Sequence, residues 1–290
     1  MSDEENKPQQ ADKVEPIESE GPITTRREME QVEEREAIGA NVIYETIRRE
    51  GRDELARPWQ ALAWSGLAAG LSMGFSLVAE GLLVAHLPDT PWRILISRLG
   101  YCLGFLIVVL GRQQLFTETT LTAILPLLVN RDKHTLVKVL RLWGAVLAAN
   151  LLGTYGFALL IGRTVIFDAQ VRAAFQTIGL GHTGVPLGAN ILRAIFAGWL
   201  IALMVWLLPG AHTGRVPIIV ILTYVIGLGS FTHVVAGSTS YLYLVVTGVA
   251  PWSHYFREFL FPALVGNIMG GVALVAALGH AQVAGGSEAR

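Results

Sequence analysis

A histidine, His233, lies inside the polar stretch SFTHVVAGSTS at residues 230–240, between two apolar runs. Histidine titrates near neutral pH and can exchange a proton with a weak acid. A second polar stretch, GRQQLFTETT at residues 111–120, interrupts another apolar run and contains Thr117. Its hydroxyl can donate and accept hydrogen bonds, although it can equally cap a following half-helix. Together the stretches predict a site for a small proton-exchanging solute inside an apolar region.

Two charged residues, Arg112 and Glu118, also belong to the first stretch. Charges within membrane spans are costly and usually face an interior or a cavity, where they are paired. The spacing of these two permits a mutual ion pair, so we assign them an electrostatic role. Because Cys102 is the single cysteine, no cysteine-based metal site is possible within one chain. We predict no metal and no cofactor.

The elements that position these residues follow from the apolar runs. A membrane-spanning helix needs about 20 apolar residues, and irregular backbone persists in a bilayer only when it is buried in protein or lines a cavity. The sequence therefore predicts an all-α integral membrane protein with six transmembrane helices, of which the second and fifth are broken. The uninterrupted runs are 59–87, 136–161, 191–208 and 259–278, and the interrupted ones are 94–129 and 216–249.

Two pairs of short motifs suggest an internal repeat. Phe116-Thr117 matches Phe231-Thr232, and Asn150-Leu-Leu-Gly153 matches Asn267-Ile-Met-Gly270 at nearly the same offset. Each half then holds three spans, an odd number, so the second half enters the membrane from the opposite side. Broken helices at corresponding positions of a 3+3 inverted repeat indicate a transport site near the membrane midplane.

Charge divides the chain into predicted segments. Of the 23 acidic residues, 16 lie in residues 1–58. We predict a disordered acidic tail at 1–25, an amphipathic cytoplasmic helix at 26–57, a transmembrane channel domain at 58–280 and a C-terminal tail at 281–290. A solvated linker helix is the alternative for 26–57. The Lys and Arg bias of the short loops places both termini in the cytoplasm, and we expect a bacterial inner membrane.

The strings LFTETTL (115–121), FTHVVAGS (231–238), NILRAIFAGWLIALMVWL (190–207) and VGNIMGG (265–271) resemble the formate/nitrite transporter family. The resemblance covers about residues 36–279. It implies a homopentamer of aquaporin-like protomers, each with its own pore for small monovalent weak-acid anions such as formate, nitrite and hydrosulfide. It further implies lipid and a small anion as partners, no nucleic acid and no enzymatic activity.

The resemblance also assigns roles to residues. Thr117 and His233 match the loop threonine and the central pore histidine of the family. Tyr101 and Phe105 match an apolar constriction, and Leu115 and Ile226 match other narrow positions. The implied mechanism draws an anion into a vestibule, protonates it at or near His233 and passes the neutral acid, because a bare charge is costly in a low dielectric.

This sequence departs from the family pattern near the histidine. Thr232 stands where better-known members carry glutamate. Gly198 and Gly237 stand where those members carry asparagines that hydrogen-bond around the histidine. Arg112 and Glu118 occupy normally small positions. These departures leave the cargo open.

Three alternatives follow from the same residues. A neutral-solute pore of aquaporin type is disfavoured by the absence of paired Asn-Pro-Ala motifs. An intramembrane serine hydrolase would place Ser238 or Ser240 beside His233, but the sequence around them lacks a G-x-S-x-G motif. A non-conducting membrane sensor or scaffold on the same fold is the third alternative.

Overall fold

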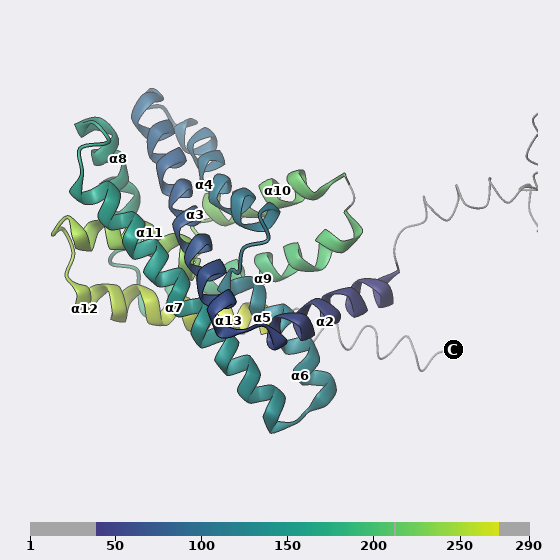
Figure 1. The fold of residues 1–290 in the computed structure, drawn as a ribbon. Coiled ribbons are helices and arrows are strands. Elements are labelled where there is room, and N and C mark those ends of the chain that lie inside the picture. Colours follow the sequence, from purple (N-terminus) through teal and green to yellow (C-terminus); the bar gives the residue numbers. More distant parts are fainter. Residues whose placement is uncertain (1–38, 212, 273–290) are drawn as a thin grey trace, which may run out of the picture. The chain divides into compact units, whose positions relative to one another are not determined.

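The computed structural model of the chain describes residues 39–211 and 213–272, which contain helices and no strand. Figure 1 shows their arrangement. The α-helices are α2 (Ala40–Ala56), α3 (Trp59–His86), α4 (Arg93–Leu110), α5 (Phe116–Thr122), α6 (Ile124–Asn130), α7 (Lys133–Arg163), α8 (Ala169–Leu180), α9 (Leu187–Leu207), α10 (Arg215–Leu228), α11 (Val234–Val246), α12 (Trp252–His254) and α13 (Phe261–Met269). A 3₁₀ turn η1 (Leu208–Gly210) follows α9, and a π-helix η2 (Tyr255–Leu260) precedes α13.

Within the described residues, four helices are long and apolar enough to cross a membrane. They are α3, α4, α7 and α9, the last extended by η1, while α10 and α11 are shorter apolar helices. The all-helical fold class is thus confirmed. The segment boundaries at 25, 57 and 280 stay predictions. Those at 25 and 280 fall in residues 1–38 and 273–290, which lie outside the described residues. Helix α8 was not predicted.

Both predicted interruptions contain a helix break, but each break is shorter than its polar stretch. Residues 111–115 separate α4 from α5, and residues 229–233 separate α10 from α11. The remaining polar residues, 116–120 and 234–240, are helical. Their hydroxyls are bonded within the helices: Thr119 Oγ1 donates to the Phe116 carbonyl and Ser238 Oγ to the Val234 carbonyl. A hydroxyl that bonds back to its own helix needs no loop.

The two breaks share one backbone geometry. A glycine ends the first helix in each, and the next residue, Arg112 or Ser230, has a left-handed φ of 49° or 50°. The amide that follows then donates 3.0 Å back to the preceding helix, from Gln113 to Val108 and from Phe231 to Ile226. Arg112 thus has the same place in the first break as Ser230 has in the second, in a helix cap of a common kind.

Asn150 of α7 and Asn267 of α13 hold the two half-helices in the same way. The Oδ1 of Asn150 accepts the Phe116 amide at 2.9 Å, and the Oδ1 of Asn267 accepts the Val234 amide at 2.8 Å. These amides start helices and have no helical acceptor. Each Nδ2 group donates to the break and to a neighbouring helix, through the carbonyls of Gln114 and Gly66 or of Thr232 and Ala194.

This duplicated bonding supports the inverted repeat and corrects its register. The asparagine motifs correspond, as the sequence indicated. The Phe-Thr motifs do not: Phe116, the first residue of α5, corresponds to Val234, whereas Phe231 lies within the second break. Short matches between sequences arise by chance, and the hydrogen bonds give the better alignment.

Glycines let the helices that carry the asparagines approach their neighbours closely. A Cβ at Gly70 of α3 would overlap the carbonyl oxygen of Asn150, and one at Gly198 of α9 would overlap that of Asn267. The partner glycines Gly153 and Gly270 face the same contacts. Backbone contact of this kind requires residues without side chains. The α3–α7 and α9–α13 pairs are thus built alike.

Helix α2 docks one face on this framework. It buries Tyr44, Ile47, Gly51 and Leu55, which recur at intervals of three and four residues. Gly51 lies against the carbonyl of Thr122 at the end of α5, where a Cβ would overlap. The opposite face of α2 is rich in charged residues, and it borders the cavity described below.

Candidate functional site

The centre of the site is a buried pair from the two half-helices. The His233 Nε2 atom lies 2.8 Å from Thr117 Oγ1, and both side chains are at most 1% exposed. His233 immediately precedes α11, and Thr117 is the second residue of α5. The two residues singled out from the sequence are thus in direct contact.

The other hydrogen bond of His233 defines its neutral tautomer. The Ala236 amide donates to Nδ1 at 3.1 Å. An imidazole nitrogen that accepts a hydrogen bond carries no proton, so the single ring proton is on Nε2 and is donated to Thr117. The ring is therefore fixed at both ends.

Apolar side chains surround this pair. The Phe105 ring meets the His233 ring edge-to-face, with centroids 5.0 Å apart, and Tyr101 follows at 5.3 Å from Phe105. Phe105, Leu115 and Ile226 are fully buried in one hydrophobic cluster. Leu115 occupies the position in the first break that His233 occupies in the second, since each directly precedes a half-helix.

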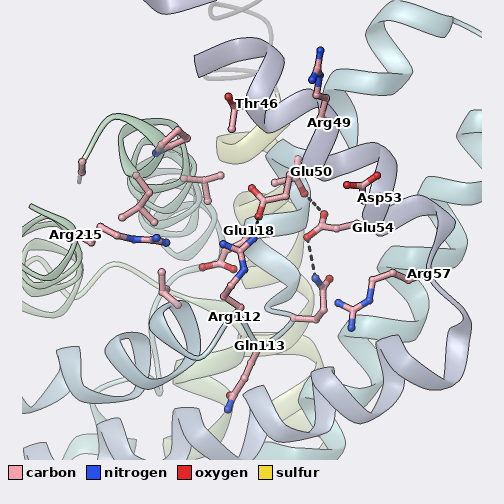
Figure 2. A pocket seen from close by; sticks show the side chains of 17 residues that line it. Thr46, Arg49, Glu50, Asp53, Glu54, Arg57, Arg112, Gln113, Glu118 and Arg215 are labelled. Atoms are coloured by element: carbon pink, nitrogen blue, oxygen red, sulfur yellow. Dashed lines mark hydrogen bonds and ion pairs between the residues drawn. The ribbon is translucent and has the colours of Figure 1, made fainter. Parts of the chain in front are cut away.

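Two cavities flank the buried group. The larger, about 680 Å³, is bordered by α2, the first break and the start of α10 (Figure 2). The smaller, about 70 Å³, is lined by Tyr101, Ile226 and, around the end of α8, by Ile178, Gly181 and His182. Helices α2 and α8 lie far apart in Figure 1. Phe105, Leu115, Thr117 and His233 line neither cavity.

The larger cavity, called here the α2 cavity, carries charges of both signs. Its carboxylates are Glu50, Asp53, Glu54 and Glu118, and its guanidinium groups are Arg49, Arg57, Arg112 and Arg215. The predicted ion pair between Arg112 and Glu118 is wrong. Arg112 Nη2 instead pairs with Glu50 Oε1 at 2.6 Å (Figure 2). The sequence spacing gave no sign of α2, which supplies a nearer carboxylate.

Glu54 fastens α2 to the first break. Its Oε1 accepts Gln114 Nε2 at 2.9 Å, and its Oε2 accepts the hydroxyl of Thr122. Sequence reasoning assigned no role to Glu54, Glu50 or Gln114. The signal present in the sequence was a carboxylate pair, Glu50 and Glu54, one turn apart on an amphipathic helix.

Burial raises the pKa of the Glu54 carboxyl above its ordinary value, against the lowering effect of its hydrogen bonds to Thr122 and Gln114. A raised folded-state pKa means that folding favours the protonated form. Its contribution to stability is complete below the pKa of the unfolded chain and is lost as pH rises through the folded pKa. Thermal unfolding of the detergent-solubilised protein should therefore show a decline in stability with rising pH that is smaller in Glu54→Gln.

The matched control for that measurement is Asp53→Asn, which makes the same chemical change at the adjacent, exposed carboxylate. It should leave the decline in place. A Glu54→Gln variant with the same pH dependence as the unmodified chain would contradict the assignment.

Two asparagines at positions other than 198 and 237, Asn190 and Asn267, hydrogen-bond Thr232 in the second break. Thr232 Oγ1 donates to Asn190 Oδ1 at 2.6 Å, and Asn267 Nδ2 donates to the Thr232 carbonyl at 2.9 Å. Asn190 also donates to the carbonyl of Glu258. The sequence signal for this contact was Asn190, a polar residue directly before the apolar run 191–208. Thr232 is thus held by uncharged partners.

The local hydrogen bonds disfavour a serine hydrolase. Ser238 Oγ is bonded to the Val234 carbonyl and the Tyr255 hydroxyl, and Ser240 Oγ to the Gly237 carbonyl. Both nitrogens of His233 are engaged elsewhere, so no serine is activated by it. Among residues 39–211 and 213–272, no three His, Cys, Asp or Glu side chains gather as a metal site.

A family model described as formate/nitrite transporter matches residues 41–281. The chain belongs to the formate/nitrite transporter family. Inner membrane protein YfdC of Escherichia coli (strain K12) is 42% identical over 89% of this chain and 83% of that protein. Uncharacterized transporter YrhG of Bacillus subtilis (strain 168) is 26% identical over 80% of this chain and 89% of that protein.

Two solved structures share the fold. A pentameric formate channel with formate bound has a TM-score of 0.64 and 18% identity, covering 81% of this chain and 98% of its own. An FNT family ion channel has a TM-score of 0.67 and 19% identity, covering 84% and 98%. Membership of the formate/nitrite transporter family makes the chain a multi-pass membrane channel or transporter for anions, and not an enzyme.

Proposed function

We propose that the protein passes small monovalent weak-acid anions, such as formate or nitrite, with protonation near His233. The observation that carries the proposal is the His233–Thr117 pair, buried among apolar side chains between two cavities. An anion loses its hydration in such a constriction at high cost, whereas the neutral acid does not. The neutral acid retains a carbonyl that can accept a hydrogen bond from Nε2 or Thr117.

The surroundings proposed for this pathway come partly from relatives. YfdC is an inner membrane protein, which supports the same location for this chain. The pentameric formate channel of the same fold supports a homopentamer with one pore in each protomer. The duplicated breaks support a 3+3 inverted repeat with the pathway at its centre. The basic loop residues support cytoplasmic termini.

Reconstitution tests the proposal with His233→Ala. Liposomes holding the unmodified protein should take up formate or nitrite faster than protein-free liposomes, with uptake rising as pH falls. His233→Ala should reduce this uptake at least about tenfold, the equivalent of one lost hydrogen bond of about 1.4 kcal/mol. Stopped-flow recording of internal pH or of solute uptake measures the effect.

Thr117→Val serves as a companion variant, because it keeps the side-chain volume and removes the hydroxyl. It should change uptake in the same direction. The proposal fails if formate, nitrite and other small monocarboxylates all permeate at the protein-free rate. Faster liposome swelling with uncharged solutes alone would favour a neutral-solute pore. No permeation of any solute would favour a non-conducting scaffold.

A further inference from the structure

The α2 cavity contains buried polar atoms that lack a hydrogen-bond partner. Three are acceptors, the Oε1 atoms of Gln113, Gln114 and Glu118, and one is a donor, Nε of Arg215. Arg215 comes from the start of α10, whereas Gln113 and Gln114 lie in the first break and Glu118 lies in α5. Figure 2 shows Arg215, Gln113 and Glu118 around the cavity. A buried polar group without a hydrogen-bond partner is unfavourable. The arrangement therefore suits a ligand that both donates and accepts.

Among the unpartnered oxygens, that of Gln114 is held in place by the other end of its side chain. Gln114 is only 7% exposed, and its Nε2 donates to Glu54. The other end of the same amide, Oε1, is the atom left without a partner. Glu118 has no cationic partner within ion-pair distance among the described residues, because the guanidinium of Arg112 is taken by Glu50. Glu118 also follows Thr117 directly in α5, so it lies at the entrance to the constriction.

The chemistry of these groups favours one ligand class. An anion that stays charged would meet the amide oxygens of Gln113 and Gln114, which can only accept and offer it nothing. A cation would be repelled by Arg215. A small carboxylic acid in its protonated form supplies a hydroxyl donor for the acceptors and a carbonyl acceptor for Arg215. That species is the one that must enter the constriction in the proposed function, on which this inference rests.

His233 is poorly placed to supply the proton. Its neutral ring has one proton, on Nε2, which is donated to Thr117, and its Nδ1 accepts the Ala236 amide. Giving up that proton would leave an imidazolate in an apolar constriction, which is prohibitive. The proton must come from a group that the anion meets earlier.

We propose that Glu118 protonates the incoming weak-acid anion in the α2 cavity. The anion accepts the N–H of Arg215, the O–H bond of the Glu118 carboxyl breaks and a new O–H bond forms on the substrate. The products are a Glu118 carboxylate and the neutral acid, which moves on past Thr117. Water on the same side returns a proton to Glu118. The charged groups facing this step are Arg49, Glu50, Asp53, Glu54 and Arg57 of α2, Arg112 of the break and Arg215 of α10.

The test compares formate uptake by liposomes against pH for the unmodified protein and Glu118→Gln. The amide preserves shape but has no acidic proton, so the variant depends on acid formed in bulk water. Formate uptake by Glu118→Gln should fall about tenfold for each unit that the pH rises, as the fraction of formic acid does. Uptake by the unmodified protein should decline less steeply with pH, and the uptake rates of the two proteins should become equal at low pH.

Two further variants separate the roles. Arg215→Gln should raise the formate concentration for half-maximal uptake without changing the slope with pH. Asp89→Asn, a carboxylate-to-amide change at an exposed residue that lines neither cavity, should leave both unchanged. Identical pH profiles for the unmodified protein and Glu118→Gln would overturn the inference while leaving the proposed function intact. Absence of uptake by the unmodified protein would overturn both.

A binding measurement covers a variant that folds but does not conduct. Formate added to weakly buffered, detergent-solubilised protein should cause proton uptake from the medium as Glu118 is recharged, and Glu118→Gln should reduce that uptake severalfold. Proton uptake of equal size in both proteins would contradict the proposal. A response to glycine and none to formate would replace the ligand class by a zwitterion and also overturn it.

Discussion

Replacing Asn267 by leucine is expected to destabilise the folded protein by about 3 kcal/mol or more. The leucine side chain fills similar space but forms no hydrogen bonds. The Val234 amide and the carbonyls of Thr232 and Ala194, which all bond to Asn267 at 2.8–2.9 Å, are then left without partners. Asn267 is fully buried, so water cannot replace it. Thermal unfolding in detergent, followed by size-exclusion chromatography, measures the loss.

Two comparisons make that result specific. Asn267→Asp keeps the acceptor for Val234 but loses both donors, and it should also be strongly destabilised. Asn130→Ala removes one hydrogen bond of an exposed side chain, to Thr135 at 3.1 Å, and should change stability by less than about 1 kcal/mol. Near-normal stability of Asn267→Leu would show that the asparagine does not hold the half-helix.

Gly70→Ala is expected to have an effect of similar size. The added methyl group would overlap the Asn150 carbonyl oxygen, which belongs to the backbone of α7 and cannot rotate away. The helices must separate, which loosens the Gly153 contact and the hydrogen bond from Asn150 to the Gly66 carbonyl. We expect a loss of about 3 kcal/mol or more, the upper range for overpacking. The yield of folded protein and its unfolding midpoint report this change.

Gly156→Ala is the matched control, because nothing lies within 4 Å of a Cβ built at that glycine of α7. Alanine is the better helix former by up to about 1 kcal/mol. The control should therefore be unchanged or slightly more stable. Equal behaviour of the two variants would rule out close backbone contact as the reason for glycine at position 70.

The pairing of His233 with Thr117 was predictable from the sequence because each residue sits in a polar interruption of an apolar run. In a bilayer such interruptions must face inward, which leaves few places for them to meet. The extent of each break was overestimated because serine and threonine are common in loops, whereas here Thr119 and Ser238 bond to their own helices. Composition does not distinguish these two uses of a hydroxyl.

The charged side of the site was not predictable in the same way. Arg112 and Glu118 are close in sequence and opposite in charge, yet Arg112 pairs with Glu50, 62 residues earlier. That choice depends on how α2 docks through Gly51 and Ile47, which no local pattern reveals. Helix α8 was missed for a related reason. It is only 12 residues long, and its buried side chains, such as Phe175, are identified only by their contacts with α3 and α11.

The asparagine hydrogen bonds also set an order for assembly on the ribosome. The first half-helix begins at Phe116, but the side chain that satisfies its amide is 34 residues further along; for Val234 the distance is 33. At about 5–20 residues per second, each half-helix waits roughly 2–7 s for its partner. During that interval the unpaired amide at the start of the half-helix is unfavourable in lipid. We therefore expect α5 to stay in the insertion machinery until α7 is made, and α11 until α13 is made. Each half-helix should then enter the membrane together with the helix that carries its asparagine.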